Sequence, residues 1–129
     1  MIRVPDSAAP EERMDIYHGW FNLKDGVGDA EFAGHFAAYM QHLEAGGRIA
    51  GWRLTRRKLG LGPSFLPEFH VMIETTGLAQ LDEAFAEVAS RAGAVEGLHH
   101  AVNGRVRDVF FALYRDFPDA ARRIGEERF

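Results

Sequence analysis

Two histidines in strand-like segments are the residues of this chain best suited to chemistry. His18 occurs in MDIYHGWFNLK and His70 in EFHVMIETT. Histidine titrates near neutral pH, so imidazoles that face one cavity can take up and release protons during a reaction. We predict that His18 and His70 are catalytic. The alternative is that they form hydrogen bonds across an interface between subunits.

Six further side chains are suited to holding a small molecule beside these histidines. Aromatic rings stack on an aromatic substrate, an arginine holds a carboxylate or phenolate, and an amide or carboxylate binds polar atoms. The alternatives are neutralisation of Arg53 by Glu74, and core or interface packing for the aromatic residues. The predicted substrate-binding residues are Trp20, Asn22, Arg53, Glu74, Phe110 and Tyr114.

Other kinds of catalytic site have less support in the sequence. The chain has no cysteine, which excludes disulfides, thiolate nucleophiles and Cys-ligated metal centres. Its six histidines follow no fixed metal-binding motif, so we predict no cofactor and no metal. A histidine-based metal or haem site is kept as an alternative. The loop Gly60–Pro63 lacks the lysine of a P-loop and is predicted to be a turn.

Length and charge limit the class of protein further. The 129 residues suffice for one domain, and 15 basic against 19 acidic side chains give a net charge of -4. This balance argues against a nucleic-acid partner. No apolar run approaches the ~20 residues needed to cross a bilayer, and no secretory or transit signal is recognisable. We therefore predict a cytoplasmic protein of bacterial type without a membrane partner.

Strand-like and helix-like segments alternate along the chain. One helix is predicted from an N-cap at Asp29 to Gly46, and another from Gly77 to near Gly93. The stretch VEGLHHAVNGRV allows one further helical turn. The predicted strands cover residues 14–24, 49–61, 68–76 and 107–117.

The order β-α-β-β-α-β predicts a ferredoxin-like α+β fold, a four-stranded antiparallel sheet with two helices on one face. We expect this domain to span residues 14–118, with a flexible N-terminal arm at 1–13 and a charged tail at 119–129. Met14 is an alternative start of the natural chain.

Strand alternation predicts which side chains face the helices. In the first strand Tyr17, Gly19 and Phe21 are assigned to the helix side, because Gly19 permits a helix to approach closely. In the second strand Trp52 and Leu54 point inward. The predicted open face then holds His18, Trp20, Asn22, Arg53, Thr55, His70, Met72, Glu74, Phe110 and Tyr114. Two such faces packed together would enclose a polar-lined cavity, which predicts a homodimer with a small-molecule site.

The chain also resembles known proteins. The segments MDIYHGWFNLK, GWRLTRRKLGLGP, EFHVMIE and VEGLHHAVNGRV are similar to an uncharacterised bacterial family, from about Met14 to the C-terminus. More broadly the chain resembles the dimeric α/β-barrel superfamily, which includes stress-responsive A/B-barrel proteins and antibiotic-biosynthesis monooxygenases. This resemblance implies a dimer, with a site between sheet and helices or inside the barrel. It implies no particular substrate.

Three functions remain open from the sequence. The first is a cofactor-independent oxygenase or isomerase-like enzyme that acts on an aromatic or polyketide-like molecule. The second is a non-catalytic, stress-related dimer that binds a small molecule in the same cavity. The third is the histidine-based metal or haem site.

Overall fold

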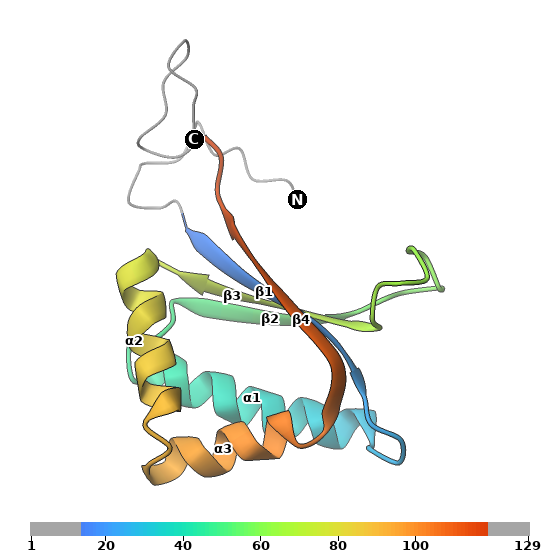
Figure 1. The fold of residues 1–129 in the computed structure, drawn as a ribbon, viewed down its shortest axis with the longest axis horizontal. Helices are drawn as coiled ribbons and strands as arrows, with labels where there is room; N and C mark the ends of the chain where they lie inside the picture. Colours follow the sequence, from blue (N-terminus) through green and yellow to red (C-terminus); the bar gives the residue numbers. More distant parts are fainter. Residues whose placement is uncertain (1–13, 119–129) are drawn as a thin grey trace.

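A computed structural model of the chain describes residues 14–118; the predicted arm at 1–13 and tail at 119–129 lie outside the described residues. The described segment forms one sheet with helices on one side (Figure 1). Its elements are β1 (Asp15–Leu23), α1 (Asp29–Ala45), β2 (Gly51–Arg56), β3 (Phe69–Thr75), α2 (Leu78–Ala89), α3 (Gly93–Asn103) and β4 (Val106–Arg115). No helix within residues 14–118 is long and apolar enough to cross a membrane.

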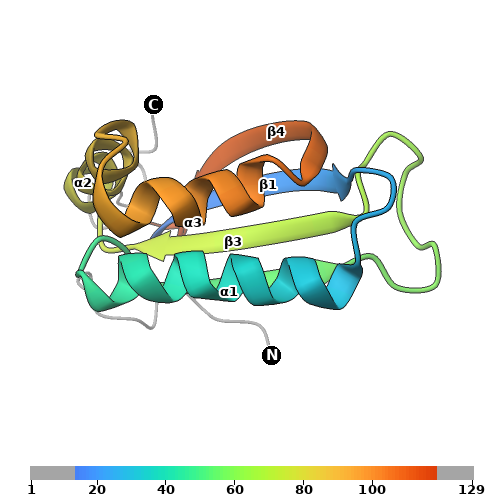
Figure 2. The same cartoon turned by 90° about the horizontal axis from the view of Figure 1, so that it is seen from below.

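The sheet has four antiparallel strands in the order β2-β3-β1-β4. The helices α1 and α3 run along one face of the sheet, and α2 lies at one end of that face (Figure 2). Together with the element order, this arrangement confirms the predicted ferredoxin-like α+β fold. No described element covers the opposite face, which we call the open face.

Along the strands, apolar side chains at alternate positions pack against the helices. Trp52 and Leu54 of β2 pack on the core, as predicted. The spacing of apolar residues places five side chains on one face of α1. Four of them, Phe32, Phe36, Met40 and Leu43, are buried, and Tyr39 is half-buried. The buried core comprises Phe21, Phe32, Phe36, Met40, Leu43, Ile49, Phe69, Val71, Ala84, Val95 and Val102.

Gly19 faces the helix side of the sheet, but the predicted reason for this glycine is wrong. A Cβ at Gly19 would lie 3.0 Å from Val71 Cγ1 and 3.1 Å from Phe111 Cε1, and no helix atom is among its nearest neighbours. The Phe111 ring of β4 therefore occupies the space that a side chain would need. There it stacks on Tyr17, with 5.1 Å between ring centroids.

Two predicted helix boundaries differ from the structure. Gly28, not Asp29, is the N-cap of α1, and Asp29 is the first helical residue. The Asp29 carboxylate instead accepts a hydrogen bond from the Ala30 backbone N–H and pairs with Arg56. α2 ends at Ala89, with Ser90 as its C-cap, rather than near Gly93.

The buried face of α2 also differs from the prediction. The sequence pattern places Leu78, Leu81, Phe85, Val88 and Ala89 on one face, but only Leu81 and Ala84 are buried, and Phe85 is about half exposed.

The third helix is the largest departure from the sequence prediction. α3 has 11 residues where the sequence allowed a single turn. Gly93 at its first position and Gly97 in its interior lower the intrinsic helix propensity and so conceal the helix. Val95 and Val102 are buried in the core beneath α3, which packs on α1. Tertiary packing therefore supplies the stability that local propensity lacks.

The loop between β2 and β3 is longer than predicted, because β2 ends at Arg56 rather than near residue 61. Leu59 and Gly60 have positive φ angles of 57° and 67°, which turn the chain out of the sheet and confirm a turn here. The Arg57 guanidinium donates a hydrogen bond to the Leu66 carbonyl. The loop extends beyond the sheet (Figure 1). Two of its large apolar side chains are exposed, Leu61 to 76% and Phe65 to 78%.

Candidate functional site

The open face brings together the aromatic residues that the sequence placed there. Trp20 pairs with His70 on one side and with Phe110 on the other, so the three share a face. The Trp20 ring lies nearly parallel to the His70 ring, with 4.6 Å between centroids, and to the Phe110 ring at 5.2 Å. Tyr114 meets the His18 ring edge-on at 4.8 Å. These rings form a continuous layer across β3, β1 and β4.

His18 and His70 lie at the centre of this layer and contact each other. His18 Nδ1 is 2.8 Å from His70 Nε2, so one imidazole donates a hydrogen bond to the other. Burial lowers the pKa of His18, and burial together with the His18 charge lowers the pKa of His70. Both rings are therefore neutral at neutral pH, the state in which a histidine accepts a proton.

The other predicted site residues lie around this pair. Arg53 pairs with Met72, and Glu74 pairs with Gly51, so both side chains belong to the open face. Within residues 14–118, no ion pair joins Arg53 to Glu74, although the sequence raised that alternative. Both charged groups therefore remain available to a ligand or to a second subunit.

Asn22 differs from these residues, because hydrogen bonds within the protomer occupy its amide. The Nδ2 group donates to Asp108 Oδ2 at 3.1 Å, and Oδ1 accepts from the Glu68 backbone N–H at 2.8 Å. The β1–β4 register shifts beside Asn22, where Asp108 has a positive φ of 58°. The amide ties the end of β1 to both neighbouring strands, so substrate binding by Asn22 would require these bonds to break.

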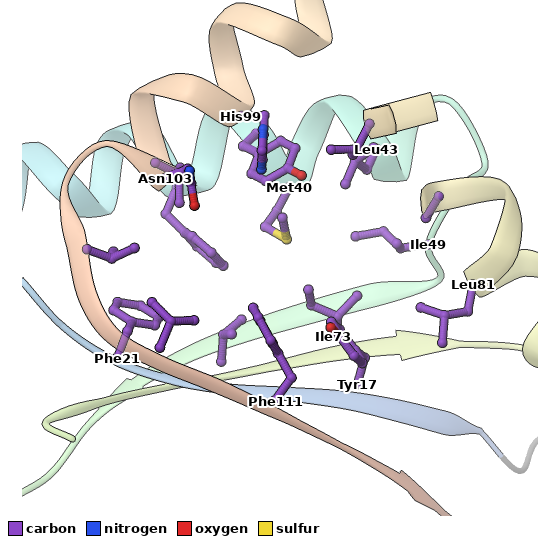
Figure 3. Close-up of a pocket in the computed structure, with 18 residues that line it drawn as sticks. Tyr17, Phe21, Met40, Leu43, Ile49, Ile73, Leu81, His99, Asn103 and Phe111 are labelled. Atoms are coloured by element: carbon purple, nitrogen blue, oxygen red, sulfur yellow. The ribbon is translucent and has the colours of Figure 1, made fainter. Parts of the chain in front are cut away.

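An apolar cavity lies on the other side of the sheet. The residue pattern did not predict it, although the resemblance to the α/β-barrel superfamily implied a site between sheet and helices or inside the barrel. The cavity measures about 170 Å³ and lies between the sheet and all three helices (Figure 3). Its walls combine the helix-facing side chains of the strands with the buried faces of α1, α2 and α3. The lining residues include Tyr17, Phe21, Phe36, Met40, Leu43, Ile49, Val71, Ile73, Leu81, Ala84, Val88, Val102 and Phe111.

Three polar side chains face this apolar cavity, namely Tyr39 from α1 and His99 and Asn103 from α3. None of them forms a side-chain hydrogen bond with another residue of the 14–118 segment. The Tyr39 and His99 rings lie 5.7 Å apart. In Figure 3, His99 and Asn103 project from α3 toward the cavity. Together they can bind the polar atoms of a molecule whose remainder is apolar.

The electrostatic environment keeps the Tyr39 hydroxyl protonated. Burial, with a smaller effect from the Glu87 charge, raises the pKa of Tyr39 to about 12. At neutral pH the phenol is therefore a hydrogen-bond donor. The sequence signal that could have pointed to this site is Tyr39 itself, a polar-tipped residue between Phe36 and Met40 on the buried stripe of α1.

A second hollow, which we call the vestibule, adjoins the cavity between α2 and α3. It measures about 400 Å³ and shares Val88, His99 and Asn103 with the cavity. Its other lining residues are Phe85, Ala89, Arg91, Glu96 and His100. The shared residues form the boundary between the apolar cavity and this more polar space.

The described residues offer little to a metal ion. No group of three or more His, Asp or Glu side chains in the 14–118 segment is placed to hold one. His18 and His70 form a pair without a third ligand, and the His42 ring is bonded to Glu87 at 2.9 Å. His99 and His100 are adjacent in sequence but differ in position. His100 lines only the vestibule, whereas His99 also lines the cavity.

Fold and sheet topology define a protein of the ferredoxin-like class. The chain belongs to DUF6614, a family of unknown function whose model matches residues 14–129. This match confirms the resemblance to an uncharacterised family from about Met14 onward. No curated protein matches the sequence.

Solved structures with similar folds share little sequence with this chain. SnoaB, a cofactor-independent oxygenase from Streptomyces nogalater, has a TM-score of 0.61 and 12% identity, over 86% of this chain and 99% of its own. A dimeric ferredoxin-like protein of unknown function from Thermobifida fusca has a TM-score of 0.53 and 16% identity, over 78% and 90%. A dimeric protein of unknown function from Bacteroides fragilis gives 0.50 and 12%, over 80% and 96%. At these identities the similarity establishes the fold alone.

Proposed function

We propose that this protein binds a compact, largely apolar small molecule in the cavity between its sheet and its helices. The observation that carries the proposal is the combination of an apolar cavity of about 170 Å³ with three side chains, Tyr39, His99 and Asn103, that lack hydrogen-bond partners among the described residues. Tyr39 and His99 are half-buried and Asn103 is exposed, and the last two also line the vestibule, so these polar groups lie where the apolar wall meets the more polar space. In a ligand site they fix the orientation of the bound molecule.

The size of the cavity indicates the kind of ligand. A dry apolar cavity of about 150 Å³ is large enough for benzene. This space therefore suits a molecule with one aromatic ring or with two fused rings. The aromatic walls formed by Phe36, Phe111 and Tyr17 favour a planar molecule. A hydroxyl or carbonyl on the ring could form hydrogen bonds with Tyr39, His99 or Asn103.

We further propose that two copies associate through their open faces. The Phe110 and Tyr114 side chains are 42% and 58% exposed in the protomer, beside Trp20 and the histidine pair. A contiguous exposed aromatic patch of this kind is typical of an interaction surface. Similar folds from Thermobifida fusca and Bacteroides fragilis are described as dimeric, which supports the proposal.

Binding of an aromatic probe tests the cavity. We expect 2-naphthol to bind saturably, and Ala84→Leu to weaken binding by about tenfold or more because the added side chain fills the space. Ala86→Leu is the matched control, because Ala86 lies on the exposed side of the same helix. Isothermal titration calorimetry on all three proteins gives the affinities. Equal affinities in the wild type and Ala84→Leu, or no saturable binding by the wild type, would exclude the cavity as the site.

The histidine pair favours a second candidate function, acid–base catalysis between two open faces. Here His18 and His70 are the catalytic residues. Trp20, Phe110 and Tyr114 would stack on the substrate, while Arg53 and Glu74 would bind its polar atoms. Asn22 would join them only by giving up its hydrogen bonds to Asp108 and Glu68. The 2.8 Å contact and the lowered pKa of both rings support this candidate, since a neutral imidazole is available as a base.

Catalysis by the pair predicts a particular pH dependence. A base with a lowered pKa is lost by protonation, so turnover should fall as the pH drops below the ordinary histidine range, about pH 6.5. His18→Gln and His70→Gln should each abolish turnover and leave ligand affinity nearly unchanged. The substrate is first sought by native mass spectrometry of freshly purified protein, and its turnover is then followed chromatographically. Turnover that persists in both variants would exclude this role.

A further inference from the structure

The vestibule between α2 and α3 has a chemical character that the apolar cavity lacks. Glu96, His99 and His100 line it from α3, and Arg91 lines it from the connection between the two helices. Because the vestibule shares Val88, His99 and Asn103 with the cavity, a molecule that fills the cavity can extend into it past these residues.

One buried side-chain atom in the lining of the vestibule has no hydrogen-bond partner. Glu96 Oε2 is buried from solvent and forms no hydrogen bond, the only such side-chain atom in the 14–118 segment. Arg91 and His100 also line the vestibule, yet neither forms an ion pair with Glu96. A buried oxygen that has lost water without gaining a donor is unfavourable, unless another molecule supplies the donor.

The surroundings of Glu96 define what can supply that donor. Val88 and Phe85 of α2 line the same hollow and offer no side-chain donor. Arg91 and His100 are exposed, and water screens the Arg91 charge.

We propose that Glu96 determines specificity by accepting a hydrogen bond from a hydroxyl or amino group at one end of the ligand. The ligand's apolar ring then occupies the cavity, and a short polar arm enters the vestibule. The substrate class is therefore a one- or two-ring aromatic molecule with a donor-bearing side arm. This inference rests on the proposed binding in the cavity. It adds the chemical group that the ligand carries at its other end, on the polar arm.

A matched set of four naphthalene probes tests the role of Glu96. The probes are 2-methylnaphthalene, 2-naphthalenemethanol, 2-naphthylmethylamine and 2-naphthoate, which differ only in the group at the arm. We expect the alcohol or the amine to bind about tenfold more tightly than the methyl compound, and the naphthoate to bind most weakly. The probe with the higher affinity, alcohol or amine, shows whether the ligand's arm carries a hydroxyl or an amino group.

Variants of Glu96 then separate this interaction from binding in the cavity. Glu96→Leu removes the acceptor and should abolish the preference for the alcohol or amine while leaving 2-methylnaphthalene affinity unchanged. Glu96→Gln keeps the shape and removes the charge, so it should selectively weaken the amine. Glu44→Gln, at an exposed position on α1, controls for the change in net charge.

The outcomes distinguish the two proposals. If 2-methylnaphthalene binds but the polar probes bind no more tightly, or Glu96→Leu leaves their preference intact, the inference about Glu96 is wrong and the cavity proposal stands. Preference for 2-naphthoate also overturns it, in favour of Arg91 and His100. If no probe binds the wild-type protein, both proposals fail.

Discussion

A single charge on the open face, introduced by Phe110→Glu, is expected to convert the proposed dimer into monomers. Phe110 stacks on Trp20 and is 42% exposed in the protomer, so the substitution should not disrupt the protomer's core. In a two-fold symmetric interface the new charge occurs twice, and each uncompensated buried charge costs about 3–5 kcal/mol. The dissociation constant should therefore rise by about a thousandfold or more.

Leu113→Glu is the control for this experiment, because Leu113 lies on the same strand but points to the opposite face. Its side chain is 50% exposed, close to the value for Phe110, and the added charge is the same. Sedimentation velocity over a range of protein concentrations measures both variants. Dissociation by Leu113→Glu while Phe110→Glu remains dimeric would place the interface on the helix side. A monomeric wild-type protein would rule out association altogether.

The second large effect concerns two phenylalanines one helical turn apart on α1. Phe32 is fully buried, packs against Phe21 and Phe69, and does not line the cavity, whereas Phe36 does line it. Phe32→Ala should lower the free energy of unfolding by about 4 kcal/mol. Phe36→Ala should cost about 1 kcal/mol less, because a side chain beside an empty space has fewer packing contacts to lose.

Urea denaturation at one fixed protein concentration measures this pair. A fixed concentration is needed because association contributes to the apparent stability of a dimer. Equal losses for the two substitutions would indicate that the region around Phe36 is as densely packed as that around Phe32. That result would remove the structural basis for ligand binding there.

The open face could be predicted because strand alternation requires no knowledge of tertiary contacts. His18 and Trp20 share a face in any strand, and the antiparallel pairing then places His70 and Phe110 beside them. The arrangement of these residues on one face is confirmed. Their catalytic and substrate-binding roles stay predictions.

The residues that line the cavity could not be predicted from the sequence pattern, because three separate helices and the sheet contribute them. Only the superfamily resemblance implied a site between sheet and helices, as one of two places. Tyr39 and His99 come from helices that are far apart in sequence. The helix that supplies His99 was itself missed, since Gly93 and Gly97 obscure its pattern. Side-chain hydrogen bonds could not be predicted from the sequence either. The sequence therefore assigned a substrate-binding role to Asn22, whose amide is bonded within the protomer.

The position of β1 in the middle of the sheet has a consequence for how the protein is synthesised. β1 is the first strand of the described segment to leave the ribosome, yet one of its edges pairs with β4, the last, and Asp15 and Arg115 are 100 residues apart. That edge keeps unpaired backbone groups until β4 has been made. Such distant pairing slows folding and leaves a nascent strand open to other chains. Chaperones that bind extended segments should therefore associate with the nascent chain until β4 emerges.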